Sequence, residues 1–371
     1  MKKLVSLLLA LMLVLSMCAF ASAEDAPKKV GIAMPTQSLE RWNRDGAYLK
    51  EQFEAAGYET IVTYSDNQND KQVNDIANML SQDVSILIIS CIDSDGLNTV
   101  LDEAAEKGIP VIAYDRMIFN DAVTYYVSFD NYTVGVLQGT FVKEALDLDN
   151  AGDKTFNMEF TGGAPTDPNA AYFFNGAYDQ LKDYIDAGTI IVPSGQNTIE
   201  QVGTEQWSTD VALSRAQNIL GSYYADGTVL DAWLCSNDST AAGVAQAIES
   251  DYAGDNDVIV TGQDGDIANL VNIVDGKQTM TVYKNVANEA VVTLSVAKAI
   301  LEGEEIDGEA LAAAQDVECA YDTESYASSE GHPTPSFLLV PTVVTKDNLD
   351  YLVETGLYKW DADHKYLEAV N

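Results

Sequence analysis

Short apolar runs with high β propensity alternate with amphipathic helical stretches along nearly the whole chain, and this alternation most constrains the fold. The run 85–90 is almost entirely apolar, as a strand buried on both faces requires. A β-α-β order indicates a parallel sheet with right-handed crossovers and with helices on its faces. In the first part of the chain we predict strands 29–34, 60–64, 85–90, 110–114 and 124–129, and helices 41–56, 70–81 and 94–107.

The same rhythm then starts again, without a sequence repeat between the halves. It predicts a second α/β sandwich of similar size, joined to the first by short ordered crossings rather than by a flexible linker. The run 337–344 is β-like, and two last helices, 345–354 and 361–369, are expected to cover an edge. The other predicted elements are helices 133–146, 170–185, 209–224, 240–251, 267–275 and 287–301 and strands 156–160, 189–193, 229–236, 258–261 and 279–283.

The first 23 residues have the pattern of an export signal. Two lysines precede an apolar run at 4–15 that is too short to span a membrane, and Ala21-Ser22-Ala23 is an A-x-A cleavage site. We therefore expect an exported protein. Cys18 lies in a segment similar to a bacterial lipobox, although Met17 is larger than the residue normally found before a lipidated cysteine, so lipidation at Cys18 stays open.

The charge of the chain excludes two classes of partner. The formal net charge is −38, which repels nucleic acid and anionic membranes. The three cysteines after the signal are Cys91, Cys235 and Cys319. An odd number implies no closed disulfide framework, and we expect no disulfide.

Polar side chains recur where predicted strands end. The strand 110–114 runs directly into Asp115 and Arg116, and such a pair makes sense at the lip of a cleft, where something polar completes its hydrogen bonds. In open α/β sheets, ligands bind beyond the carboxyl ends of the strands. We therefore expect a ligand site there, with candidate residues Arg41, Trp42, Asp115, Arg116, Asp167, Asn169, Trp207, Asn237, Asp264 and Lys284.

The chemistry of this set suits a neutral or weakly charged sugar. Asp, Asn, Arg and Lys make fork-like hydrogen bonds to vicinal hydroxyls, and aromatic rings stack on the C–H face of a pyranose. A phosphate ligand is disfavoured because neither GxGxxG after a strand nor GxxxxGK[ST] occurs.

Each member of the set also has a purely structural interpretation, which the sequence leaves open. These interpretations are a surface ion pair for Asp115-Arg116, a helix cap for Asn237 and for Asp264, a solvated lysine for Lys284 and core aromatics for Trp42 and Trp207. Trp233, inside an apolar strand, is expected in the core.

Residue sets for catalysis are sparse. His332 and His364 have neither a candidate nucleophile nearby nor metal-ligand spacing, and no G-x-S-x-G occurs. Paired carboxylates can hydrolyse glycosides, which keeps a secreted glycoside-acting enzyme as the alternative. However, Asp115, Asp167 and Asp264 each accompany amides or cations, which keep a carboxylate ionised. We expect a binding protein that is not an enzyme and that has no cofactor and no metal.

Seven stretches, in order along the chain, resemble the type I periplasmic sugar-binding proteins of ABC transporters. They span nearly the whole chain after the signal, and the resemblance is closest to the branch that holds the xylose-binding protein and the multiple-sugar-binding protein ChvE. The stretches are GIAMPTQSLERW at 31–42, VIAYDRM at 111–117, SFDNYTVGVLQ at 128–138, GGAPTDPNA at 162–170, SNDSTAAG at 236–243, GQD at 262–264 and QTMTVYK at 278–284.

The resemblance implies an α/β fold of two Rossmann-like lobes, each a parallel sheet flanked by helices. Three hinge crossings would join the lobes, with the ligand cleft between them. The implied N-terminal lobe is 24–130 plus 285–336, and the C-terminal lobe is 131–284 plus 337–371. The implied ligand is an aldopyranose such as xylose, arabinose, glucose or galactose. The implied partner is the membrane permease of an ABC transporter, and a sensor or chemoreceptor is compatible with the same role. We expect a monomer in the periplasm or on the outer face of the cytoplasmic membrane.

The ligand contacts carried over by motif leave strict xylose specificity in question. Xylose-binding proteins carry a lysine where Met34 stands here, and Pro168 interrupts what is usually an Asp-Asn-Asn run. Both departures favour the relatives of broader specificity. The implied contacts are Arg41, Asp115, Arg116, Asp167, Asn169, Trp207, Asn237, Asp264 and Lys284, with Trp42 and Phe173 as further stacking faces.

Overall fold

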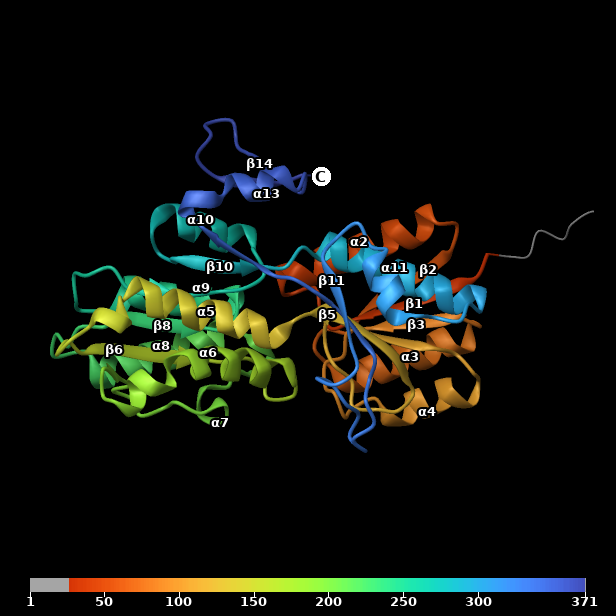
Figure 1. Cartoon of the computed structure of the whole chain (residues 1–371), viewed down its shortest axis with the longest axis horizontal. Coiled ribbons are helices and arrows are strands. Elements are labelled where there is room, and N and C mark those ends of the chain that lie inside the picture. The colour runs from red at the N-terminus through yellow and green to blue at the C-terminus, as the bar shows by residue number, and fades with distance from the viewer. Residues whose placement is uncertain (1–26, 371) are drawn as a thin grey trace, which may run out of the picture.

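The structure, a computed structural model, describes residues 27–370. Two α/β lobes lie side by side (Figure 1). The predicted export signal at 1–23 and the lipidation site at Cys18 lie outside the described residues. No helix within residues 27–370 has the length and apolar character needed to cross a membrane.

The first lobe contains a seven-stranded sheet in the order β11-β12-β5-β4-β3-β1-β2. All neighbours are parallel except β11 and β12, as the β-α-β rhythm predicts. Its elements are β1 (Lys29–Met34), α2 (Glu40–Ala55), β2 (Glu59–Tyr64), α3 (Asn69–Ser81), β3 (Ile86–Ile89), α4 (Asn98–Glu106), β4 (Val111–Tyr114), β5 (Val123–Phe129), α11 (Val286–Glu302), α12 (Gly308–Ala313), β11 (Cys319–Asp322) and β12 (Ser336–Leu339).

Helices cover both faces of this sheet because β3 and β4, near its centre, are buried at every position. Leu87 and Ile89 of β3 join the core with α3 and α4. Ile86 and Ile88, which point to the other face, join the core with α2 and α11. The sheet is therefore fixed between two helical layers, and its carboxyl edge is free to carry polar side chains.

The second lobe repeats this arrangement around the sheet β7-β6-β8-β9. α5 and α6 cover one face, and α8 and α9 cover the other. A parallel bridge between Gln263 and Val282 continues the sheet to the pair β10-β13. The elements are α5 (Asn131–Ala145), η1 (Leu148–Asn150), β6 (Phe156–Thr161), α6 (Asn169–Asp186), β7 (Ile190–Ile191), α7 (Ile199–Val202), η2 (Glu205–Trp207), α8 (Thr209–Tyr223), β8 (Ala232–Cys235), α9 (Asp238–Asp251), β9 (Ile259–Val260), α10 (Ile267–Asp275), β10 (Met280–Tyr283), β13 (Thr342–Thr345), η3 (Lys346–Asn348), α13 (Asp350–Glu354), β14 (Tyr358–Trp360) and β15 (Leu367–Ala369).

The chain crosses between the lobes three times: after β5, between β10 and α11, and between β12 and β13. The last crossing lies later than predicted. Phe337, expected to begin the second lobe's last segment, pairs with Val127 of β5 in the first lobe. The run 337–344 is continuous in hydropathy, but Val340 and Pro341 divide it into two strands that belong to different lobes.

The predicted helix 361–369 is wrong, because β14 and β15 form an antiparallel hairpin there. Asp361 closes the turn: its side chain accepts from the backbone N–H of Lys365 at 2.8 Å, and its own N–H donates to the carbonyl of Tyr366 at 2.8 Å. The hairpin and α13 pack against α10. Within residues 27–370, Cys91, Cys235 and Cys319 are free cysteines.

Candidate functional site

Arg41 and Trp42 lie in the first turn of α2, which follows the carboxyl end of β1. Arg41 Nη2 pairs with Asp45 Oδ1 at 2.7 Å, one helical turn later, and the Tyr114 hydroxyl donates to the same oxygen at 2.9 Å. Arg41 Nη1 lies 2.8 Å from Asp115 Oδ1. The guanidinium is thus held by Asp45 and extended toward the carboxyl end of β4.

Asp115 follows β4 with a left-handed backbone, φ 58°. A non-glycine residue rarely adopts this conformation, and neighbouring contacts must offset its cost. Three donors hold the Asp115 carbonyl: the hydroxyls of Tyr126 at 2.6 Å and Ser128 at 3.0 Å, and the side-chain amide of Asn169 in the other lobe at 2.6 Å. The direction of the Asp115 side chain is therefore fixed through its backbone.

Arg116 and Asp167 join the two lobes directly, with Nε 3.0 Å from Oδ2. The indole N–H of Trp207 donates to the same Asp167 oxygen at 3.1 Å, and the backbone N–H of Asn169 donates to the other at 3.0 Å. The alternative of a surface Asp115-Arg116 ion pair is wrong. The two residues are only 3% and 5% exposed, and each pairs with a partner elsewhere.

Lys284 follows β10 and is 1% exposed, so it is not a solvated lysine. Its Nζ lies 2.9 Å from Asp115 Oδ1 and 3.5 Å from Asp264 Oδ1. It also lies 5.7 Å from the ring centroid of Phe173. Lys284 therefore joins a carboxylate of each lobe at the second crossing.

The two predicted helix caps have different outcomes. Asn237 caps α9, since its Oδ1 accepts from the N–H of Thr240 at 3.0 Å, and it also lines the cavity described below. Asp264 is not a cap, because α10 starts after Asp266. Its backbone has φ 108°, an unusual conformation for an aspartate.

Trp42 and Trp207 fit both interpretations given to them, as core aromatics and as residues of the ligand site. Trp42 belongs to the first lobe's core, and Trp207 packs with Phe173, so both are core aromatics that also face the cavity. The Trp207 ring lies against Gly163, where a Cβ would come within 1.9 Å of the ring. Trp233 is fully buried in the second lobe's core, as predicted.

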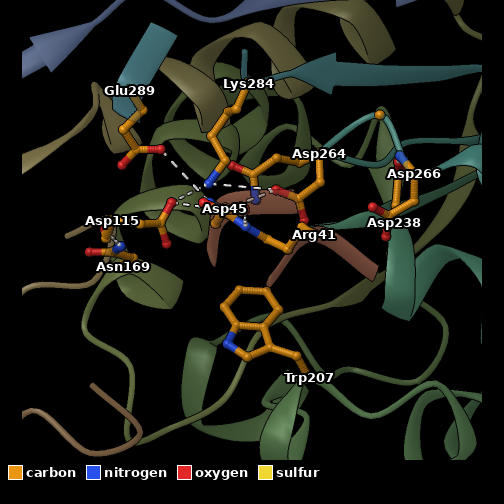
Figure 2. A network of polar contacts seen from close by, with 12 residues as sticks. Arg41, Asp45, Asp115, Asn169, Trp207, Asp238, Asp264, Asp266, Lys284 and Glu289 are labelled. Carbon is orange, nitrogen blue, oxygen red and sulfur yellow. Dashed lines mark hydrogen bonds and ion pairs between the residues drawn. The ribbon is translucent and has the colours of Figure 1, made fainter. Parts of the chain in front are cut away.

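The predicted site residues surround one cavity between the lobes, with a volume of only about 20 Å³. This is far below the few hundred Å³ of a typical small-molecule site, because side chains of the two lobes pair directly across it. Figure 2 shows Arg41, Asp115, Asp264 and Lys284 converging, with the Trp207 ring across from them. The structure thus brings together every predicted site residue: Arg41, Trp42, Asp115, Arg116, Asp167, Asn169, Phe173, Trp207, Asn237, Asp264 and Lys284.

Burial and ion pairing act in opposite directions on the carboxyl groups. For Asp115, burial alone would raise the pKa, but Arg41 and Lys284 outweigh it and lower the pKa to about 2. For Asp167, burial outweighs Arg116 and raises the pKa, whereas the amides and cations beside it were expected to keep its pKa from rising. Burial also raises the pKa of Glu289 well above its usual range.

Some residues around the site were not predicted. Leu39, Ser239 and Gln263 also line the cavity, and the last two lie inside conspicuous stretches, SNDSTAAG and GQD. The sequence could have shown the role of Asp45, because it stands four residues after Arg41 on a predicted helix, the spacing of an ion pair. Nothing in the sequence indicated a role for Glu289, since a glutamate in a long helix is usually solvated.

Three residues that could together bind a metal ion lie outside the cavity lining. Asp121, Glu330 and His332 bring ligand atoms within 4.8 Å of one another at the exposed surface, and His332 Nδ1 lies 2.6 Å from Asp121 Oδ2. The sequence did not suggest this contact because residues 121 and 332 are far apart along the chain. None of the three lines the cavity.

Comparison with known proteins places the chain in a family. Residues 30–305 match the periplasmic binding protein domain. The chain is 39% identical over 337 residues to the multiple sugar-binding periplasmic receptor ChvE of Rhizobium radiobacter, covering 90% of this chain and 91% of that protein. It is 32% identical over 332 residues to the D-xylose-binding periplasmic protein of Escherichia coli strain K12, covering 89% and 91%.

A solved structure shares the fold closely. An ABC transporter solute binding protein from Clostridium phytofermentans, with bound β-D-glucose, is 45% identical, with a TM-score of 0.83 and coverage of 91% of this chain and 99% of that one. The matched domain spans most of the chain, and the relatives cover it almost from end to end. The chain therefore belongs to the periplasmic binding protein family.

Proposed function

We propose that this protein is the extracytoplasmic monosaccharide-binding component of an ABC-type sugar importer, which closes by hinge motion on an aldopyranose. One observation carries the proposal: polar and aromatic side chains from both lobes converge on a single cavity. A ligand that contacts both lobes stabilises the closed arrangement, because it binds that arrangement better than the open one.

The charge balance of the cavity favours a neutral ligand. Its lining holds three cations and three carboxylates, and each cation already has a carboxylate partner. An anionic ligand would compete with these carboxylates, whereas sugar hydroxyls can both donate and accept hydrogen bonds beside them. The proposed ligand contacts are Arg41, Trp42, Asp115, Arg116, Asp167, Asn169, Phe173, Trp207, Asn237, Asp264 and Lys284.

The relatives support the same ligand class. Their names include a multiple sugar-binding receptor and a xylose-binding protein, and the solved relative holds glucose. Xylose, arabinose, glucose and galactose are therefore the first candidates. Met34 and Pro168, which depart from the xylose-binding pattern, favour a receptor for more than one sugar.

The rest of the proposal follows from this role. The closed protein, exported and acting as a monomer, would dock on the membrane permease of the transporter, and a sensor or chemoreceptor could bind the same closed form. Lipidation at Cys18 would hold it at the outer face of the cytoplasmic membrane. Treatment of cells with a signal-peptidase inhibitor specific for lipoproteins, followed by mass measurement, tests the lipid anchor.

Isothermal titration calorimetry tests the ligand class. We expect at least one member of a panel of D-xylose, L-arabinose, D-glucose and D-galactose to bind with a Kd well below about 1 mM, and hexuronic acids to bind more weakly. If no sugar of the panel binds below about 1 mM, the proposed function is wrong. Turnover of aryl glycosides would instead support the enzyme alternative.

A further inference from the structure

Arg44, on the first lobe's α2, contacts the second lobe just outside the cavity. Its Nη2 donates to the carbonyl of Asp264 at 3.2 Å and pairs with Asp266 Oδ1 at 3.0 Å. Its Nη1 donates to the carbonyl of Gly265 at 3.3 Å. One guanidinium thus holds three consecutive residues of the opposite lobe.

Glu40, one helical turn before Arg44, adds a second contact to the same segment. Its Oε1 accepts from the backbone N–H of Ile267, the first residue of α10, at 3.0 Å. The same oxygen pairs with Arg44 Nη1 at 3.1 Å. Glu40 therefore orients Arg44 and binds the start of α10 at the same time.

The second lobe supplies only part of the support for this segment. The N–H of Asp266 donates to Asp238 Oδ2 at 2.9 Å, and the Tyr358 hydroxyl donates to the Gly265 carbonyl at 3.0 Å. Asp264 itself has the unusual φ of 108°. A strained residue keeps its conformation only when its surroundings determine it, and here some of those surroundings belong to the other lobe.

The Arg44–Asp266 pair is largely removed from water, with side chains 15% and 7% exposed. Exposed ion pairs contribute little, whereas removing one partner of a desolvated pair has a large effect. Neither Glu40 nor Arg44 lines the cavity, so any influence on a bound sugar is indirect, through the position of Asp264 or through the stability of the closed arrangement.

We propose that Glu40 and Arg44 form an interlobe latch that positions Asp264 and that is complete only when the lobes are closed. The inference rests on the proposed sugar-binding function. Contacts made only in the closed form lower its free energy relative to the open form. Because a sugar enters the open form and leaves only after opening, the latch slows dissociation and leaves association nearly unchanged.

Stopped-flow fluorescence with the tighter ligand of D-glucose and D-xylose separates the two rates. We expect Arg44→Ala to raise the dissociation rate about 10- to 100-fold and Glu40→Ala about 3- to 10-fold, with association within about twofold of wild type. Lys50→Ala is the matched control, since Lys50 lies on the same helix and, among residues 27–370, its ion pair is within that helix, with Glu54. Its rates should equal those of wild type.

The melting temperature of the sugar-free protein separates positioning from folding. If Arg44→Ala misfolds, Glu40→Ala replaces it, since Glu40 is partly exposed and its loss leaves no fully buried charge unpaired. Three results overturn the latch while wild-type sugar binding stands. The first is a dissociation rate of the folded variants equal to that of wild type, and the second is a change of that rate in Lys50→Ala as large as in Arg44→Ala. The third result is slower association in a variant whose melting temperature also falls. A wild type that binds neither sugar overturns the proposed function and the latch with it.

Discussion

Arg41 of the first lobe and Asp264 of the second are joined across the cavity, with Nη1 3.3 Å from Oδ1. The same carboxylate oxygen lies 3.5 Å from Lys284. Asp264 is therefore shared by two cations that lie at the first strand end and at the second crossing. A carboxylate held in this way can accept sugar hydroxyls without moving, which keeps the entropic cost of binding low.

Asp264→Asn should weaken sugar binding about 100-fold, because a charge-assisted acceptor contributes roughly 1.5–3 kcal/mol per hydrogen bond and the amide also brings a donor toward two cations. Calorimetry measures the loss of affinity. Asp255→Asn, at an exposed position of the same lobe, is the control and should bind as wild type does. Retained affinity in Asp264→Asn would remove Asp264 from the site.

Glu289 should make the protein less stable as the pH rises. Both of its carboxyl oxygens are buried without a hydrogen-bond partner, and Arg41 Nη2 lies 3.8 Å away. Burial raises the pKa of Glu289 well above its usual range. A carboxyl group whose pKa is higher in the folded protein takes up a proton on folding. The contribution of Glu289 to the free energy of unfolding is complete below the unfolded pKa of about 4.3. It is lost as the pH rises through the pKa of Glu289 in the folded protein.

Glu289→Gln, which has the shape of the protonated acid, should remove that loss. Its free energy of unfolding should rise relative to wild type by up to about 1.4 kcal/mol per pH unit above pH 5. Urea unfolding between pH 4 and pH 8 measures the difference. Glu302→Gln, at an exposed position of the same helix, should show no such trend, and a Glu289→Gln difference independent of pH would contradict the prediction.

Gly163→Ala should displace Trp207, because the added methyl group would lie within 1.9 Å of the indole ring. Overpacking of this kind costs about 1–3 kcal/mol, and here it shifts a cavity wall. We expect sugar affinity to fall about tenfold or more, with a change in tryptophan emission. Gly221→Ala is the control: a Cβ there meets nothing within 4 Å, so it should stabilise α8 by about 0.5–1 kcal/mol and leave affinity unchanged.

Tyr126→Phe should weaken both stability and sugar binding, because the Tyr126 hydroxyl holds the carbonyl of the strained Asp115. Loss of one buried hydrogen bond costs about 1 kcal/mol, and we expect a similar loss in binding free energy. Tyr125→Phe tests the neighbouring position, whose side chain points to the other face and packs against Phe337. Equal losses in affinity for the two variants would contradict a positioning role for Tyr126.

Most of the site was visible in the sequence because the carboxyl ends of parallel strands meet at one edge. Residues as distant as Asp115 and Lys284 therefore met as predicted. The sequence did not predict which partner each of these residues pairs with. Asp115 and Arg116 are neighbours in sequence, but the left-handed turn at Asp115 separates their side chains and sends them to different partners.

The fold was less predictable where hydropathy alone had to distinguish elements. The segment 361–369 has helix-forming residues, but the turn at Asp361 makes it a hairpin. The segment 337–344 forms two strands in two lobes, a division marked in the sequence only by Pro341. In both cases a single local contact or residue overrides a propensity that is weak by itself.

The position of β12 in the first lobe's sheet has a consequence for biosynthesis. β12 lies between β5 and β11, yet most of the second lobe, from α5 to β10, is encoded between β5 and β12. A ribosome therefore releases most of the second lobe before the first sheet can close, and it releases β13 to β15 of the second lobe after that. Both lobes stay incomplete until the last part of the chain is made. Such a delay keeps the nascent polypeptide open until late, which suits a chain that must be threaded across a membrane before it folds.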